Sequence, residues 1–146
     1  MMRFLILLTV SVSLSGCFLI PFIDTFQKSG ITESSRKELL PKKVKSFYSN
    51  VVAGRFFDMA EYLHPDRKDT LLNAMRKNRK IEKVTAYEVD YLEFFEGANT
   101  AEVHLLVSYY HTPYYVVQQR LEKQIWKFYG SRSSWRLYQR VIDENS

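Results

Sequence analysis

The sequence predicts an α+β domain in which N-terminal helices pack on a curved four-stranded antiparallel sheet. Apolar side chains recur at helical spacing between residues 36 and 80, whereas from Ile81 onward they alternate with a period of two. Clusters of turn-forming residues at 96–99, 111–113 and 130–133 divide this second half into four strands. Helices followed by a run of strands favour one sheet with the helices on one of its faces.

A short apolar segment opens the chain and ends in Leu14-Ser15-Gly16-Cys17. Met1-Met2-Arg3 provides a positive start, and Phe4–Leu14 is shorter than the roughly 20 residues of a permanent membrane span. This arrangement resembles a bacterial lipoprotein signal, which implies cleavage between Gly16 and Cys17 and lipid attachment to Cys17. A conventional secretory signal and a buried apolar helix are the alternatives. Residues 1–16 would be the signal peptide.

Cys17 is the only cysteine of the chain, so no intramolecular disulfide is possible. The chain carries 21 Lys and Arg against 16 Asp and Glu, and this mildly basic balance is typical of an ordinary solvated surface. Attraction of the tethered domain to an anionic membrane surface is the alternative. Nucleic acid is not expected as a partner, because no basic-aromatic motif occurs. Phe18 stands where inner-membrane lipoproteins commonly carry Asp, which predicts an outer-membrane anchor facing the periplasm if the source has two membranes.

Residues 17–35 are expected to be the lipidated cysteine and its tether, and 36–146 a single domain. Phe18–Ile23 and Phe26 are mostly apolar, and they either lie in the membrane interface or fold back onto the domain. Residues 27–35 are polar and rich in turn formers.

The first helix is expected to start at the capping box of Ser35 or at Pro41, and to end at Gly54. Its predicted buried positions are Val44, Phe47, Tyr48 and Val51, and its predicted outward positions are Lys42, Lys43, Lys45 and Asn50. A second short helix is predicted from the apolar spacing of Phe56, Phe57, Ala60 and Leu63. Asp66 is expected to cap a third helix, whose predicted buried side is Leu71, Leu72 and Met75.

Alternation predicts the faces of the first two strands. The expected inward residues are Tyr87, Val89 and Tyr91 on the first strand and Val103, Leu105, Val107 and Tyr109 on the second. The third strand, within Val116–Phe128, keeps no clean alternation, and a bulge near Ile125 would reconcile its two parities. Trp135–Val141 is the fourth strand.

Three segments resemble the NTF2-like (cone-shaped α+β) superfamily, and they are Val44–Asn50, Gly54–Asp66 and the pair Trp126-Lys127 with Trp135-Arg136-Leu137. The resemblance covers roughly residues 38 to 142 and implies a curved sheet wrapped around the first long helix, with space for a pocket between them. A cystatin-like helix and meander is the alternative. The resemblance implies no single function, since the superfamily includes isomerases, dehydratases, adaptors and structural modules.

No catalytic set is evident from the sequence. The predicted inward faces of the first two strands carry no carboxylate or imidazole, which leaves Asp58, Glu61 and His64 as acid-base candidates. His64 more readily fits a helix end before Pro65, and Asp58 a surface position. The three histidines show no metal-ligand spacing and no phosphate loop occurs, so neither a metal nor a cofactor is expected.

Four tyrosines surround one predicted turn in Tyr109-Tyr110-His111-Thr112-Pro113-Tyr114-Tyr115. Tyrosine offers large contact area at low entropy cost, so Tyr109, Tyr110, His111, Tyr114 and Tyr115 are the candidate partner-binding or ligand-binding residues. Core packing of alternate rings is the competing interpretation. The sequence therefore favours a non-enzymatic, membrane-anchored envelope lipoprotein that binds a protein partner. A module for a small ligand or glycan, or a pocket enzyme of isomerase or hydrolase type, is the alternative.

Overall fold

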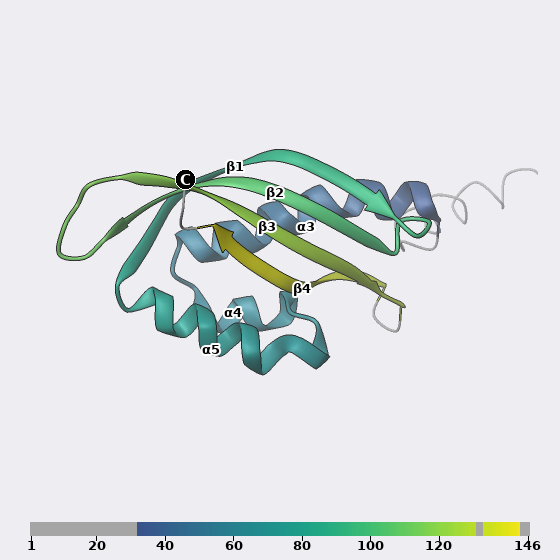
Figure 1. The fold of residues 1–146 in the computed structure, drawn as a ribbon. Helices are drawn as coiled ribbons and strands as arrows, with labels where there is room; N and C mark the ends of the chain where they lie inside the picture. Colours follow the sequence, from purple (N-terminus) through teal and green to yellow (C-terminus); the bar gives the residue numbers. More distant parts are fainter. Residues whose placement is uncertain (1–31, 131–132, 144–146) are drawn as a thin grey trace, which may run out of the picture.

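The computed structural model describes residues 32–130 and 133–143. Within these ranges, three α-helices precede four strands, in the order α3 (Glu33–Val52), α4 (Phe56–Met59), α5 (Lys68–Arg79), β1 (Glu82–Phe95), β2 (Thr100–His111), β3 (Gln118–Tyr129) and β4 (Ser134–Asp143). The strands form one antiparallel sheet in sequence order. In Figure 1, α3 runs along one face of the curved sheet, with α4 and α5 beside it. The predicted fold class is confirmed.

Helix α3 begins before both of its predicted starts. The Thr32 hydroxyl accepts a hydrogen bond from the Ser35 backbone N–H at 3.2 Å, so Thr32 is the N-cap and Ser35 lies in the first turn. Pro41 lies inside the helix and does not end it. Leu40 and Val44 are fully buried, so packing against the core stabilises the helix on both sides of the proline. Gly54 follows the helix end with a positive φ of 68°, as predicted.

The segment after α3 forms a single α-helical turn and then continues as a narrower 3₁₀-helix. Of the apolar residues whose spacing predicted this helix, Phe56 is buried and Phe57 is 88% exposed, while Met59 is buried as well. The chain then enters a 3₁₀-helix, Ala60–Tyr62, which turns the Tyr62 ring into the core. Asn50 was misplaced by the sequence prediction, because it is buried and donates to the Tyr62 hydroxyl at 3.4 Å.

Helix α5 follows a second 3₁₀-helix, Pro65–Arg67, and Asp66 therefore does not cap it. Its N-cap is Arg67, whose side chain makes no capping hydrogen bond. Leu71 and Met75 face the core as predicted. The last turn carries the basic side chains of Arg76, Lys77 and Arg79. Their positive charges interact favourably with the negative end of the helix dipole.

Strand β1 departs from simple alternation. Its pairing with β2 shifts register between Val84 and Ala86 and again between Val89 and Tyr91. Val89 and Tyr91 are exposed, contrary to the prediction, and Tyr91 follows the second shift. The β1 side chains that pack against the core are Val84, Tyr87, Leu92 and Phe94. The bulge predicted near Ile125 is confirmed by a register shift between Ile125 and Trp126.

The core lies between α3 and the concave face of the sheet. Phe47 of α3 meets Trp126 of β3 edge to face, with ring centroids 5.8 Å apart. Trp135 anchors the start of β4, and its indole N–H donates to the Arg36 carbonyl at 2.8 Å. Within the described ranges, no helix is both long and apolar enough to cross a membrane.

Candidate functional sites: a tyrosine hairpin, a buried ion network and a cavity

The tyrosine hairpin is the segment Tyr109–Val117, in which the end of β2 and the connection to β3 extend beyond the body of the domain (Figure 1). Four consecutive large side chains at its tip are largely in solvent, with exposed fractions of 75% for Tyr114, 74% for Tyr115, 66% for Val116 and 60% for Val117. Contiguous exposed apolar side chains of this kind mark interaction surfaces in soluble domains. The core interpretation therefore does not apply to these tip residues.

The five predicted binding residues divide into two groups. Tyr110 and Tyr115 lie with their rings 5.3 Å apart, and Tyr114 is beside them in sequence at the exposed tip. Tyr109 and His111 pack against each other at the base of the hairpin, with ring centroids 5.3 Å apart. The hairpin thus presents tyrosines at its tip and fixes its base against the domain.

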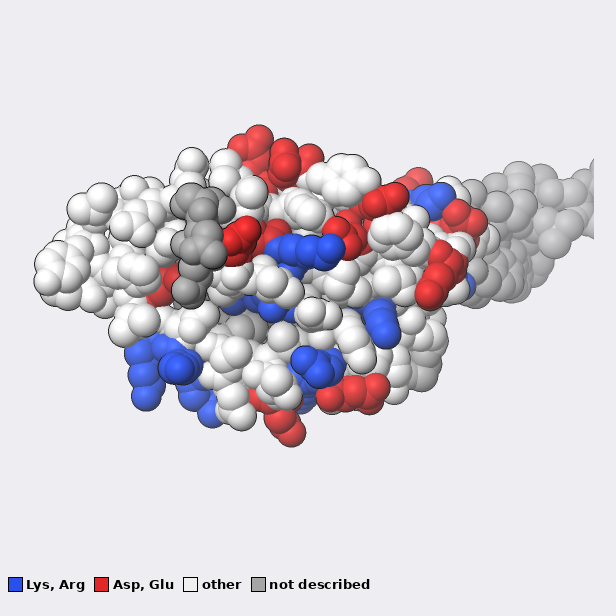
Figure 2. Space-filling model, in the orientation of Figure 1, with Lys and Arg blue, Asp and Glu red and all other residues white. Residues whose placement is uncertain are grey.

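The hairpin contains no Asp, Glu, Lys or Arg, and His111 is its one ionisable side chain besides the tyrosines. No Asp, Glu, Lys or Arg occurs between Val103 and Gln119. Figure 2 shows the same end of the molecule free of red and blue, whereas basic side chains gather over the end of α5 nearby. A partner for this tip would meet aromatic rings, hydroxyl groups and valine methyls.

Four charged side chains form an ion network inside the domain, and they are Glu82, Arg120, Glu122 and Arg140. Glu122, only 1% exposed, accepts hydrogen bonds from Arg140 Nε at 2.8 Å, from Arg120 Nη2 at 2.7 Å and from the Tyr48 hydroxyl at 2.6 Å. Arg120 also donates to both carboxylate oxygens of Glu82. The network joins α3, β1, β3 and β4, and it balances two carboxylates with two guanidinium groups.

Neutral polar groups extend this network into the core. Gln124 donates to the Tyr48 hydroxyl at 2.8 Å and accepts from the Trp126 indole N–H at 2.9 Å. Tyr109 lies over Arg120, with 4.4 Å between the guanidinium carbon and the ring centroid. The base of the hairpin therefore rests directly on the ion network.

Burial and charge oppose each other in setting the pKa of Glu122. Burial alone would raise this pKa, but Arg140, the Tyr48 hydroxyl and Arg120 outweigh it and lower the pKa to about 2. Burial, together with the nearby Glu122 carboxylate, raises the pKa of Tyr48 well above its ordinary value. Glu122 is therefore ionised and Tyr48 neutral at physiological pH, so the network has a fixed charge pattern.

Sequence reasoning missed this network. The sequence showed no clean alternation for the third strand and indicated no face for Arg120, Glu122 and Gln124, which point into the domain while Leu121 is exposed. The alternating charged pattern was visible, but hydrophobicity alone assigns polar side chains to solvent. Only the partners on other elements, chiefly Tyr48 and Arg140, make the inward arrangement favourable.

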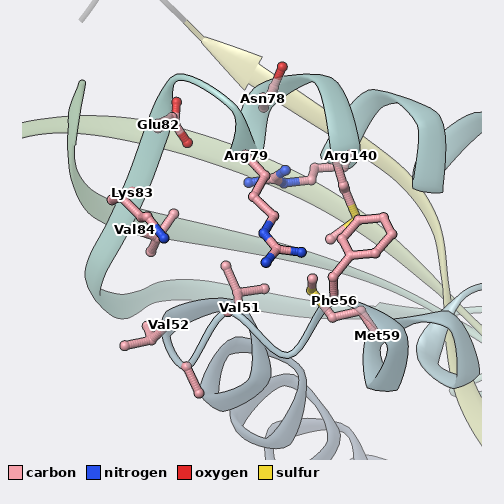
Figure 3. Close-up of a pocket in the computed structure, with 13 residues that line it drawn as sticks. Val51, Val52, Phe56, Met59, Asn78, Arg79, Glu82, Lys83, Val84 and Arg140 are labelled. Atoms are coloured by element: carbon pink, nitrogen blue, oxygen red, sulfur yellow. The ribbon is translucent and has the colours of Figure 1, made fainter. Parts of the chain in front are cut away.

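A cavity of about 110 Å³ lies beside the network, between the end of α3, the end of α5 and the start of β1. Its apolar lining includes Val51, Phe56, Met59, Met75 and Val84, and its charged lining is Arg79, Glu82, Lys83 and Arg140. Figure 3 shows the Arg79 and Arg140 guanidinium groups extending into the cavity from α5 and β4. The cavity therefore combines apolar walls with positive charge.

The predicted acid-base candidates do not come together. Asp58 and Glu61 are exposed, and none of Asp58, Glu61 and His64 lines the cavity. His64 instead packs against Tyr138, with ring centroids 5.3 Å apart, and its Nδ1 lies 3.6 Å from Asp66. In the part of the chain that the structure describes, no three His, Cys, Asp or Glu side chains gather as metal ligands would. Gly16 and Cys17 lie outside the described residues.

Comparison with solved structures identifies the fold. The chain is similar to a ketosteroid isomerase-like protein from Erwinia carotovora (TM-score 0.58, 13% identity, 75% of this chain and 95% of that chain). It is also similar to a putative polyketide cyclase from Xanthomonas campestris (TM-score 0.53, 9% identity, 71% and 92%) and to the intermembrane space region of the chloroplast protein ARC6 (TM-score 0.52, 10% identity, 69% and 91%). No protein-family model and no curated protein matches the chain.

The architecture and these neighbours together define an NTF2-like α+β fold, and the predicted resemblance is confirmed at the level of fold. The neighbours carry different descriptions, which agrees with the wide functional range of a shared fold. Function must therefore be argued from the hairpin, the network and the cavity of this chain.

Proposed function

We propose that this chain is a lipid-anchored protein of the bacterial cell envelope whose domain binds a protein partner through the tyrosine hairpin. The exposed tip of the hairpin carries the proposal, because Tyr114, Tyr115, Val116 and Val117 are all more than half exposed. Tyrosine is enriched at the energetic centres of protein interfaces, where its ring is buried and its hydroxyl finds a partner. The partner chemistry that fits is an apolar groove with hydrogen-bond acceptors along its rim.

The anchoring half of the proposal rests on the sequence Leu14-Ser15-Gly16-Cys17. The lipid would be attached to Cys17, and the anchor would lie in the outer membrane facing the periplasm if the source has two membranes. Helix α3 begins at Glu33, at the end of the domain opposite the hairpin tip (Figure 1). A chain tethered through its N-terminus would therefore direct the tip away from the lipid.

Labelling with radioactive palmitate tests the anchor. The full chain should incorporate label and sediment with membranes, whereas Cys17→Ser should lose the label and migrate as an uncleaved precursor. Ser15→Ala keeps a small residue before the cleavage point and is the matched control. Label in the Cys17→Ser chain would contradict the proposal.

Site-specific photocrosslinking in native membranes tests the partner. A photoreactive phenylalanine at Tyr115 should give one adduct of defined mass, while the same probe at Phe57, which is 88% exposed on α4, should not. Tyr114→Ser with Val116→Ser should remove the adduct and leave the melting temperature unchanged. Equal adducts from Tyr115 and Phe57 would mean that the hairpin has no special role.

Partner binding is proposed in preference to catalysis because the acid-base candidates are dispersed. Asp58, Glu61 and His64 lie outside the cavity, and Glu82 within its lining is held by Arg120. General acid-base chemistry needs a titrating group within hydrogen-bond reach of a bound substrate. The carboxylates nearest to the cavity serve as counter-ions instead.

A further inference from the structure

The charges around the cavity do not cancel. Glu122 and Glu82 are matched by Arg140 and Arg120 inside the ion network. Arg79 and Lys83 also line the cavity, and neither lies within ion-pair distance of a carboxylate among the described residues. The cavity therefore has two positive charges in excess of its acids.

Arg140 is held in a fixed position with one side free. Its Nε and Nη2 donate to Glu122 at 2.8 and 2.6 Å, while its Nη1 makes no hydrogen bond to any described residue. The guanidinium extends into the cavity in Figure 3. A donor that is already oriented loses little conformational entropy when an anion binds, so Arg140 is suited to receive a negatively charged oxygen.

Apart from its charged side chains and Asn78, the cavity is lined by apolar residues, and it is small. Met59, Met75 and Phe56 form one wall, and Val51 and Val84 lie on the other elements around it. A volume of about 110 Å³ is below the roughly 300–1,000 Å³ of sites for drug-sized ligands. An occupant must therefore be short, apolar along its length and negatively charged at one end.

We infer that this cavity binds a short monocarboxylate with an apolar chain, its carboxylate held by Arg140 and Arg79 and its chain against Met59 and Met75. Lys83 at the rim adds attraction for the anion, and Glu82 does not repel it strongly because Arg120 holds both its oxygens. The site shares no residue with the tyrosine hairpin, so it stands independently of the partner proposed above.

Calorimetric titration of the full chain in nonionic detergent tests the ligand class. Hexanoate should bind saturably, while acetate, which lacks the chain, and hexanol, which lacks the charge, should bind at least tenfold more weakly. Inorganic phosphate should not displace hexanoate. Equal binding of hexanoate and hexanol, or of hexanoate and either small anion, would overturn the inference, as would the absence of saturable hexanoate binding.

Two charge-matched double variants test the site itself. Arg79→Gln with Lys83→Gln should weaken hexanoate binding at least tenfold, whereas Lys77→Gln with Lys80→Gln removes equal charge from residues that do not line the cavity and should change affinity less than twofold. Equal losses in both would indicate nonspecific attraction and overturn the inference. Both variants change exposed side chains, so both should retain the melting temperature of the parent.

Methionine methyl groups report the position of the bound chain. The chain has four methionines, and Met59 and Met75 both lie near the cavity while Met1 and Met2 belong to the N-terminal segment. In the ¹³C-methyl spectrum, hexanoate should shift the signals of Met59 and Met75, assigned with Met59→Leu and Met75→Leu. Saturable binding without these shifts would place the ligand elsewhere and refute the site.

Discussion

Glu122 is the residue on which the polar interior depends. Replacing it with Gln would leave Arg120 and Arg140 buried with one negative charge, that of Glu82, between them. Breaking a buried ion pair in this way costs about 3–5 kcal/mol. We expect Glu122→Gln to lower the free energy of unfolding by about that amount in urea denaturation. Glu88→Gln, at an exposed position, should change it by less than about 0.5 kcal/mol; similar effects of both would show that the network adds no stability.

The same carboxylate makes stability depend on acid pH. Its pKa is lowered to about 2 in the folded chain, whereas in the unfolded chain it is near 4.3. The stabilisation is therefore complete above about pH 5 and is lost as the pH falls toward 2, with a magnitude of order 3 kcal/mol. Unfolding free energies measured at pH 7, 4 and 2.5 should fall more steeply for the parent chain than for Glu122→Gln. Parallel curves would contradict the assignment.

At the scale of single residues, the sequence predicted burial correctly where the apolar character of the residue itself determines whether it is buried. Val44, Phe47 and Tyr48 face the core as their spacing predicted. Sequence reasoning did not identify the burial of Glu122 and Arg120, because that burial depends on partners contributed by distant segments. The predicted second helix also differs from the structure, because only Phe56–Met59 forms an α-helical turn before the 3₁₀-helix Ala60–Tyr62, and Phe57 in that turn faces solvent.

At the scale of elements, Gly54 ends α3 in a conformation that favours glycine. Its φ is 68°, and a Cβ there would meet nothing within 4 Å, so any penalty for Ala is one of backbone conformation alone. We expect Gly54→Ala to lower the free energy of unfolding by about 1 kcal/mol. Gly130→Ala, where φ is not in the left-handed region and space is also open, is the matched control and should be close to neutral. Thermal denaturation of both variants measures the difference, and equal effects would mean that the helix end is not under this constraint.

The strands show why their order was easier to predict than their faces. Turn clusters set the boundaries, and the four-stranded meander followed from them. The second register shift in β1, between Val89 and Tyr91, turned Tyr91 away from the core and brought Leu92 and Phe94 inward, since one extra residue in a strand turns every later side chain over. The hairpin tip was predicted as a candidate site because tyrosines clustered there, while its projection into solvent depends on the length of the β2 and β3 strands.

At the scale of the whole molecule, the ion network predicts a single unfolding transition. It connects α3, β1, β3 and β4 through buried hydrogen bonds, so the loss of β1, β3 or β4 leaves a charge without its counter-ion and the loss of α3 removes the Tyr48 donor from Glu122. Fluorescence of the buried Trp126 and Trp135 and the far-ultraviolet circular dichroism should therefore change at the same urea concentration. A helical signal that is lost before the tryptophan signal would show that α3 unfolds separately.

The position of Arg140 on the last strand also has a consequence for how the chain is made. Glu122 and Arg120 emerge from the ribosome before β4, and until Arg140 follows, Glu122 has only one of its two guanidinium partners. A nascent chain that ends before β4 would have to bury two carboxylates, Glu82 and Glu122, with Arg120 as their one guanidinium partner in the network. The native interior is thus disfavoured during synthesis and becomes favourable when the final ten residues of the sheet are complete. Premature termination near the C-terminus should yield unfolded chains open to proteolysis.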